Sequence, residues 1–153
     1  MALKNRRIAI IGAGIAEPPL YDLAFQAGYT LGKEGAIILT GGLGGVMEAA
    51  LKGAREAGAL TVGILPGNRA EEANPYVLIP IVTDMGHARN VILVRTAELI
   101  ISIGGGYGTL SEIALALKMW KPVIGLQTWP NIPGVHYISA LEELLPKVCE
   151  FLC

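Results

Sequence analysis

The sequence is poor in the side chains that several classes of protein need. It contains only two cysteines and two histidines, and Cys149 and Cys153 lie at the C-terminal end without further metal-binding residues nearby. This arrangement argues against a zinc site, so no metal site is predicted and reduced thiols are expected. The 12 Lys and Arg balance 13 Asp and Glu, and no basic cluster exceeds KNRR near the N-terminus. That distribution argues against a nucleic-acid surface.

The chain also lacks a run of residues suited to cross a membrane. Hydrophobic residues make up 52% and the mean hydropathy is +0.51. However, the longest uncharged run, 122–141, is interrupted by Pro122, Pro130 and Pro133, whereas a spanning helix needs about 20 mostly apolar residues. MALKNRR leads straight into an apolar strand pattern without a signal-peptide layout. We therefore expect a cytoplasmic protein with no membrane partner, formed as a single domain over residues 1–153.

Short apolar runs alternate with helical patterns along the whole chain. Strands are predicted over 7–12, 36–40, 60–65, 76–82, 98–104 and 122–126, and helices over 18–33, 45–57, 86–96, 109–119 and 139–149. This alternation predicts an α/β fold with a doubly wound, mostly parallel sheet and helices on both faces. Such sheets bind ligands at the carboxyl ends of their strands. PGNRAEEANP (66–75) is predicted to be a surface loop near that edge.

Two glycine turns with one shared pattern are the main functional signal. Gly41-Gly42-x-Gly44 in TGGLGGVMEAALKG (40–53) aligns with Gly105-Gly106-x-Gly108 in GGGYGTLSEIALAL (104–117), and Glu48 aligns with Glu112. A glycine turn lets the backbone and the following helix N-terminus approach a phosphate. We predict that the two turns lie side by side and together cradle one phosphorylated ligand. The predicted ligand-binding residues of the two turns are Gly41, Gly42, Gly44, Gly45, Gly105, Gly106, Gly108 and Thr109.

The two glutamates each have a structural alternative. Thr109-Leu110-Ser111-Glu112 matches a capping box at a helix start. Gly45 stands where a capping hydroxyl would precede Glu48, so only the helix dipole explains an acid there. In the functional interpretation, both carboxylates lie in the first turn of their helices and face the sugar or ring of the ligand.

A third glycine turn, GAGIAE (12–17), follows the first predicted strand. It lacks the third glycine of the dinucleotide fingerprint, and no P-loop lysine follows any glycine run. Gly12 and Gly14 are therefore candidate ligand contacts, with a plain strand-to-helix turn as the alternative.

The segment TDMGHARN (83–90) opens the helix that leads into the strand before the second turn. Arg89 and Asn90 lie in its first turn, with Met85 just ahead. A guanidinium at this edge suits bidentate phosphate binding, and a surface salt bridge is the alternative. His87 is expected to be structural or exposed, and Asp84 is either a helix cap or a second carboxylate near the site.

Four segments together resemble the LOG-like superfamily over about residues 7–126: TGGLGGVMEAALKGA, GILPG, MGHARN and GGGYGTLSEIALALKMWKPVIGL. The resemblance implies a Rossmann-like fold and a homodimer or homotetramer. LOG enzymes are phosphoribohydrolases of cytokinin nucleoside monophosphates with the signature P-G-G-x-G-T-x-x-E, in which Gly104 replaces the proline here. By this match Glu112 is their catalytic glutamate and Arg89 the arginine of their Arg-Lys pair, whose lysine is Asn90 here.

These departures make the chain more similar to the branch that contains the molybdenum cofactor carrier proteins. That resemblance implies binding of a phosphorylated nucleotide-like or pterin ligand, and Tyr107 is a candidate ligand contact. It implies no required cofactor, and molybdenum cofactor as a carried ligand. The alternative is a phosphoribohydrolase that releases free base and ribose 5-phosphate, with Tyr107 as a candidate to stack on the base. The old superfamily label of lysine decarboxylase does not apply, because no lysine is placed to form a pyridoxal Schiff base.

Overall fold

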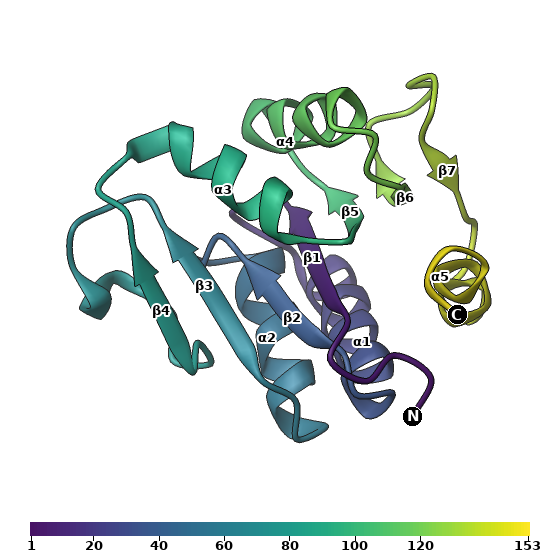
Figure 1. Cartoon of the computed structure of the whole chain (residues 1–153), viewed down its shortest axis with the longest axis horizontal. Coiled ribbons are helices and arrows are strands. Elements are labelled where there is room, and N and C mark those ends of the chain that lie inside the picture. Colours follow the sequence, from purple (N-terminus) through teal and green to yellow (C-terminus); the bar gives the residue numbers. More distant parts are fainter.

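The computed structural model describes residues 1–153 and contains one seven-stranded sheet in which all paired strands are parallel (Figure 1). The strand order is β4-β3-β2-β1-β5-β6-β7. The strands are β1 (Arg7–Gly12), β2 (Ile37–Thr40), β3 (Thr61–Leu65), β4 (Ile79–Val82), β5 (Leu99–Gly104), β6 (Val123–Thr128) and β7 (His136–Tyr137). The predicted Rossmann-like, doubly wound sheet is confirmed.

Helices cover both faces of this sheet. They are α1 (Pro18–Lys33), α2 (Val46–Glu56), α3 (Arg89–Thr96), α4 (Tyr107–Lys118) and α5 (Leu144–Leu152). Side chains of α1, α2 and α5 belong to one hydrophobic core, and those of α3 and α4 belong to a second. None of these helices combines the length and the apolar character needed to cross a membrane.

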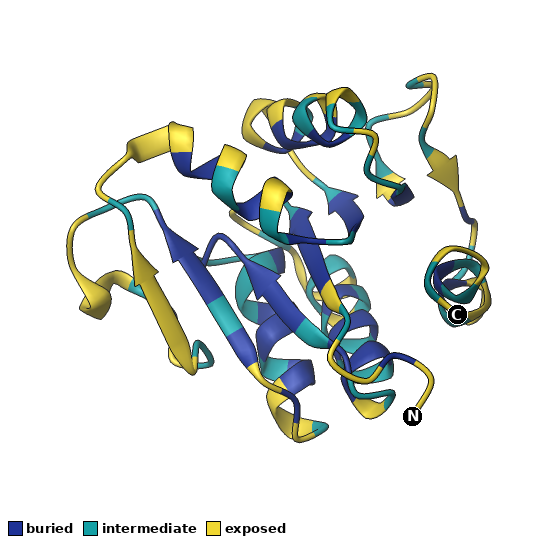
Figure 2. Ribbon diagram, viewed as in Figure 1, coloured by how far each residue is buried: buried dark blue, intermediate teal, exposed yellow.

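The central strands are buried on both faces, which explains their continuous apolar runs. In β1, Ile8 and Ile10 pack into the core beneath α1 and α2, whereas Ala9 and Ile11 pack into the core beneath α3 and α4. The alternation follows from the two-residue period of a strand. Figure 2 shows the resulting gradient, from buried central strands to the exposed edge strand β4.

The predicted boundaries differ from the observed ones mainly at the sheet edges and helix starts. The predicted strand 76–82 is reduced to β4, and β7 was not predicted. The predicted helix 86–96 divides into a 3₁₀ turn, Gly86–Ala88, and α3. The last helix begins after the 3₁₀ turn Leu141–Glu143. Short edge strands carry little periodic signal, and sheet pairing rather than local preference decides them.

The chain reverses its winding direction between β1 and β5. From β1 it proceeds outward through β2 and β3 to β4, and α3 then returns it to β5 beside β1. Loops that leave the carboxyl ends of adjacent strands in opposite directions create a crevice at such a switch point. The fold therefore predicts a ligand site between the turns that follow β1 and β5.

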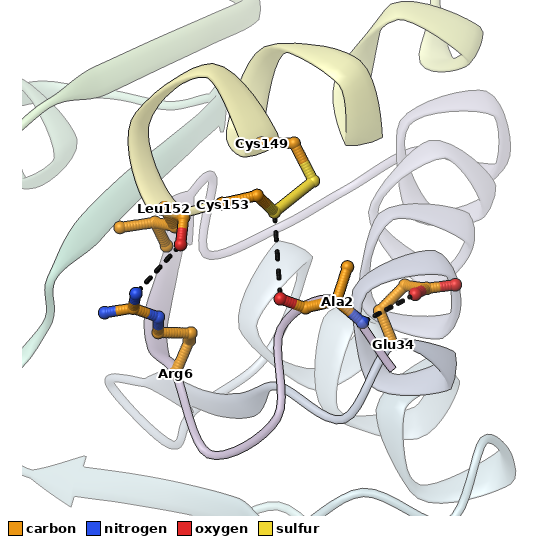
Figure 3. The surroundings of a disulfide bond; sticks show 6 residues. All are labelled: Ala2, Arg6, Glu34, Cys149, Leu152 and Cys153. Carbon is orange, nitrogen blue, oxygen red and sulfur yellow. Dashed lines mark hydrogen bonds between the residues drawn. A yellow bond between two sulfur atoms is a disulfide. The ribbon is translucent and has the colours of Figure 1, made fainter.

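The two cysteines form a disulfide at the C-terminal end of α5, so the expectation of reduced thiols is wrong for this structure (Figure 3). Cys149 and Cys153 are four residues apart, and this spacing places both side chains on one side of a helical turn. The Cys153 sulfur also lies 3.7 Å from the carbonyl oxygen of Ala2. Arg6 Nη2 donates to the carbonyl of Leu152 at 2.9 Å, which joins the two ends of the chain.

Candidate functional site

A cavity of about 290 Å³ opens at the carboxyl edge of the sheet, at the switch point between β1 and β5. Its walls come from β1 and the turn after it, from α2, from the start of α3 with the preceding 3₁₀ turn, and from the start of α4. The lining residues are Ile11, Gly12, Gly14, Met47, His87, Arg89, Asn90, Gly106, Gly108, Thr109 and Glu112.

The N-terminus of α4 forms one wall of this cavity. The helix follows Gly106, and no side chain caps it. Its first intrahelical donor is the amide of Leu110, which bonds to the carbonyl of Gly106 at 3.0 Å. The amides of Tyr107, Gly108 and Thr109 therefore have no partner within the helix. Free N–H groups and the positive end of the helix dipole together favour an anion at this wall.

The predicted capping box at the start of α4 is wrong. The helix begins at Tyr107 rather than at Thr109, so Thr109 is inside the first turn and Glu112 is in the second. Gly105 permits this early start, because its φ of +115° is open only to glycine. A Cβ at Gly105 would also overlap the Thr109 side chain. Glu112 is thereby free to take a different role.

Glu112 is an almost buried carboxyl group at the cavity. Its exposed fraction is 8%, and it neither receives a hydrogen bond nor forms an ion pair within the protein. Every fully buried side-chain oxygen in the structure has a hydrogen-bond partner. Because the Glu112 carboxyl has none, its oxygens are not fully buried, and they are open to the cavity that Glu112 lines. Burial raises the pKa of Glu112 to about 7, against the opposing attraction of Arg89. The acid and its conjugate base are both populated near neutral pH.

Arg89 is the cationic group of the cavity. It is 8% exposed, so the alternative of a surface salt bridge is wrong. Its Nε donates to the carbonyl of Ile64 at 2.8 Å, its Nη2 donates to that of Gly41 at 3.4 Å, and its Nη1 donates to Asn90 Oδ1. Burial lowers the pKa of Arg89, and the nearby Glu112 partly counteracts that shift. These bonds hold the guanidinium in one orientation.

Asn90 connects Arg89 to α4. Its Nδ2 donates to Ser111 Oγ at 3.2 Å, and that hydroxyl donates to the carbonyl of Gly108 at 2.8 Å. An amide can accept from an arginine and donate to a hydroxyl at once, which an ammonium cannot do. The chain of bonds therefore ties α3 to the first turn of α4 across the cavity.

The turn after β2 does not line this cavity with the turn after β5, and the cradle that the two turns are predicted to share stays a prediction. Strand β1 separates β2 from β5. No glycine of the first predicted turn (Gly41, Gly42, Gly44 and Gly45) lines the cavity. The amide of Val46 at the start of α2 donates to the carbonyl of Ala13 at 2.9 Å. Asn74 binds the carbonyls of Gly42 and Leu43 at 2.8 Å each.

Glu48 belongs to this structural region rather than to the cavity. It accepts a hydrogen bond of 3.0 Å from the Tyr21 hydroxyl of α1. Burial, followed by this bond to Glu48, raises the pKa of Tyr21 to about 12. Glu48 does not line this cavity, and its placement toward the ligand stays a prediction.

The remaining predicted residues divide between the cavity and its surroundings. Gly12 and Gly14 line it, so the third glycine turn is the partner of the turn after β5. Gly105, Met85 and Tyr107 do not line it, and the latter two are exposed. Asp84 is exposed and caps no helix.

Sequence reasoning missed three lining residues: Ile11, Met47 and His87. His87 is exposed, as predicted, yet it faces the cavity from the 3₁₀ turn. Its spacing two residues before Arg89 was the available signal. Ile11 and Met47 carried none, because their side chains reach the cavity through the packing of β1 and α2.

Sequence comparison places the chain among known proteins. The SLOG cluster4 family model matches residues 5–146. An uncharacterized protein of Archaeoglobus fulgidus is 45% identical over 141 residues, covering 92% of this chain and 93% of the relative. A cytokinin riboside 5′-monophosphate phosphoribohydrolase of Mycobacterium marinum is 27% identical over 144 residues, covering 86% of this chain and 75% of the relative.

Several solved structures have a similar fold. The molybdenum cofactor binding protein from Rippkaea orientalis superposes with a TM-score of 0.91 at 36% identity, over 99% of each chain. The molybdenum cofactor carrier protein from Chlamydomonas reinhardtii superposes with a TM-score of 0.88 at 35% identity, over 97% of this chain and 99% of that protein. DNA processing protein A from Helicobacter pylori has a TM-score of 0.76 at 17% identity, over 99% of this chain and 84% of that protein, a likeness of fold alone. With a family model covering nearly all of its residues, the chain belongs to the SLOG cluster4 family.

Proposed function

We propose that this protein binds and carries a phosphorylated nucleotide-like or pterin ligand in the cavity at the switch point. The observation that carries the proposal is the uncapped N-terminus of α4 facing the same cavity as the buried Arg89. The likeness to the molybdenum cofactor proteins of Rippkaea orientalis and Chlamydomonas reinhardtii favours a pterin, with molybdenum cofactor as the cargo. The protein itself needs no cofactor in this proposal.

The phosphate would lie between the free amides of α4 and the guanidinium. Arg89 uses three donors on protein oxygens, and a guanidinium has five, so two remain for a ligand. Glu112 limits the charge of the site, because its carboxylate would repel the same phosphate. Its raised pKa allows it to bind a proton when the anion enters.

Binding of inorganic phosphate and adenosine 5′-monophosphate, measured by calorimetry, tests the anion site. We expect Arg89→Ala to weaken both by about 10- to 100-fold, since a hydrogen bond to a charged group contributes about 1.5 to 3 kcal/mol. Arg95→Ala is the matched control, because Arg95 is an exposed arginine on the same helix. Equal affinity of Arg89→Ala and wild type, with both folded, contradicts the proposed site.

Hydrolysis of a nucleoside 5′-monophosphate is a second candidate function, favoured by Glu112. A carboxyl group with a pKa of about 7 can act as an acid or a base at neutral pH. Glycoside hydrolysis uses carboxyl groups around an oxocarbenium-like transition state. The phosphoribohydrolase of Mycobacterium marinum is also a distant relative.

Base release from a panel of nucleoside 5′-monophosphates separates the two functions. A hydrolase yields free base and ribose 5-phosphate, and Glu112→Gln abolishes the reaction. A carrier yields no base, although wild type and Glu112→Gln both bind phosphorylated ligands.

We also propose that the protein forms a homo-oligomer through the β4 edge, in keeping with a cytoplasmic carrier. Leu78, Ile79, Ile81 and Val82 are each 41–45% exposed. An uncovered apolar strand of a parallel sheet is unusual in a monomer, and Pro80 suits only an edge position. Sedimentation analysis should show a dimer or tetramer that Ile81→Asp shifts toward the monomer. A monomeric wild type at micromolar concentration contradicts this interface.

A further inference from the structure

An aromatic pair lies next to the cavity, outside its lining. Tyr107 is the first residue of α4, between Gly106 and Gly108, which both line the cavity. It is 83% exposed. Its ring centroid lies 5.9 Å from that of Trp129, with a tilt of 33° between the planes. The arrangement leaves aromatic surface open to solvent at the mouth of the site.

Hydrogen bonds fasten Trp129 to the glycine turn that forms the cavity wall. Trp129 Nε1 donates to the carbonyl of Gly106 at 2.9 Å, and Thr128 Oγ1 donates to that of Gly104 at 2.7 Å. The Tyr137 hydroxyl, from β7, donates to the carbonyl of Trp129. The indole is therefore held by its N–H at the edge and packs partly against the core beneath α3 and α4, so the exposed aromatic surface of the pair comes mainly from Tyr107.

The cavity is small for a complete nucleotide or pterin phosphate. Its volume of about 290 Å³ lies at the lower end of the range of about 300 to 1,000 Å³ that is usual for ligand pockets. Its chemistry also suits a phosphate better than a ring, because Ile11 and Met47 are its only large apolar lining side chains. The polar lining therefore favours a phosphate inside the cavity with its attached ring toward the opening.

A second recess lies on the other side of the same glycine turn. It also measures about 290 Å³ and is lined by Gly104, Gly105, Gln127, Thr128, Trp129 and Pro130. Trp129 thus lines this recess, and its neighbour Tyr107 lies between two residues of the phosphate cavity, Gly106 and Gly108. Tyr107 follows Gly106 and Trp129 bonds to its carbonyl, so a flat ring that extends from the cavity over Gly106 comes next to this aromatic pair.

We propose that Tyr107 and Trp129 form a stacking platform that selects phosphomonoesters carrying a flat heteroaromatic ring. The proposal rests on the proposed phosphate site and adds the residues that choose among phosphorylated ligands. Tyr107 contacts the ring, and Trp129 positions both Tyr107 and the carbonyl of Gly106. Stacking tolerates many rings because each has a π-face, which fits a carrier better than base-specific hydrogen bonds do.

Binding of three defined probes tests the platform: adenosine 5′-monophosphate, ribose 5-phosphate and the unphosphorylated pterin neopterin. Affinities are measured by calorimetry and by fluorescence in Trp120→Phe, which leaves Trp129 as the only tryptophan. Trp120 is 91% exposed and does not line the phosphate cavity, so this background should bind like wild type. We expect adenosine 5′-monophosphate to bind about tenfold more tightly than ribose 5-phosphate. Only the two probes with an aromatic ring, adenosine 5′-monophosphate and neopterin, should quench the fluorescence of Trp129.

Variants assign the effect to the two side chains. Tyr107→Ala should remove the tenfold advantage and leave ribose 5-phosphate unchanged, whereas Tyr107→Phe should keep it. Trp129→Phe keeps an aromatic face but loses the bond to Gly106, and it should reduce the advantage to a few-fold.

The outcomes separate the platform from the phosphate site. The platform is overturned by equal binding of adenosine 5′-monophosphate and ribose 5-phosphate to wild type, or by an equal loss of both in Tyr107→Ala. The phosphate site survives either result. Failure of all three probes to bind overturns the platform and the proposed function together.

Discussion

The turn after β2 and the turn after β5 share a glycine pattern, yet the helices that follow them begin at different points. Helix α2 begins at Val46, five residues after Gly41, whereas α4 begins at Tyr107, two residues after the aligned Gly105. Glu48 is consequently the third residue of α2, and Glu112 is the sixth residue of α4. A displacement of three residues rotates a side chain by about 300° around a helix axis. Glu48 and Glu112 therefore align in the sequence but project from different sides of their helices.

The two turns also differ in how their helix N-termini are used. At α2, the Val46 amide is occupied by Ala13, and Glu48 by Tyr21. Neither helix has a side-chain cap, but at α4 the Tyr107 amide has no partner and Glu112 faces the cavity without one. The turn after β2 is held by hydrogen bonds to other parts of the fold, whereas the turn after β5 leaves its polar groups available. Saturation of hydrogen bonds, more than the glycine pattern, distinguishes a structural turn from a binding turn.

Gly45→Ala should disrupt the turn between β2 and α2 and give the largest change in stability. Gly45 has a φ of +64°, and a Cβ there would overlap the carbonyl of Ala13 and the backbone of Gly14. Left-handed backbone and overpacking together should lower the free energy of unfolding by about 4 kcal/mol. Urea denaturation measures the change.

Gly58→Ala is the matched control for this substitution. Gly58 has a φ of +82° but no atom within 4 Å of an added Cβ. It should lose only about 1 kcal/mol, the cost of the backbone conformation. Equal losses at the two positions would show that the contact with Ala13 is not what makes Gly45 necessary.

Glu112→Gln tests whether Glu112, unlike Glu48, is a buried carboxyl group without a partner, through the pH dependence of stability. The pKa of Glu112 is raised from 4.5 to about 7, so the folded state holds its proton more tightly than the unfolded state. Its stabilising contribution is complete below pH 4.5 and is lost as pH rises through 7. At pH 8 the ionised group should cost roughly 3 kcal/mol, since one pKa unit is about 1.36 kcal/mol.

Denaturation midpoints of Glu112→Gln and wild type, compared at pH 4 and pH 8, measure this effect. The variant should match wild type at pH 4 within about 0.5 kcal/mol and be more stable at pH 8. A constant difference across that range would contradict the burial of an ionisable Glu112.

Gly108→Ala should raise stability and lower ligand affinity, whereas Gly45→Ala should lower stability. Gly108 lies in the first turn of α4 and lines the cavity, with no atom within 4 Å of an added Cβ. Alanine should add about 0.5 to 1 kcal/mol of helix stability. The methyl group occupies space where the phosphate approaches, so calorimetry should show weaker binding of inorganic phosphate. Unchanged affinity would place the phosphate elsewhere.

Glu48→Gln should produce the smallest change. The side chain keeps an oxygen that can accept from the Tyr21 hydroxyl, so stability should fall by about 0.5 kcal/mol, less than one net hydrogen bond. Loss of the negative charge should also bring the pKa of Tyr21 down from about 12, which a spectrophotometric tyrosine titration can follow. Binding of inorganic phosphate should stay as in wild type, and a tenfold loss would return Glu48 to the ligand site.

Much of the candidate site could be predicted, because its residues follow strands at one edge of a parallel sheet. Arg89, Asn90, Gly106, Gly108, Thr109 and Glu112 were predicted from the sequence and line the cavity, as do Gly12 and Gly14. Glu48 could not be separated from Glu112, since the sequence does not state where each helix begins. Ile11 and Met47 were missed because a lone side chain carries no pattern, whereas the spacing of His87 two residues before Arg89 was a signal that was not used.

The sequence by itself determined the doubly wound architecture, because continuous apolar strands alternating with amphipathic helices have few other ways to bury their surface. It also determined that glycine turns gather at the carboxyl edge, since parallel strands all end there. Only the tertiary structure decided which turns meet. Strand β1 lies between β2 and β5, so the turn after β1 takes the place beside α4. Strand order depends on contacts between distant segments, and local sequence patterns contain no record of it.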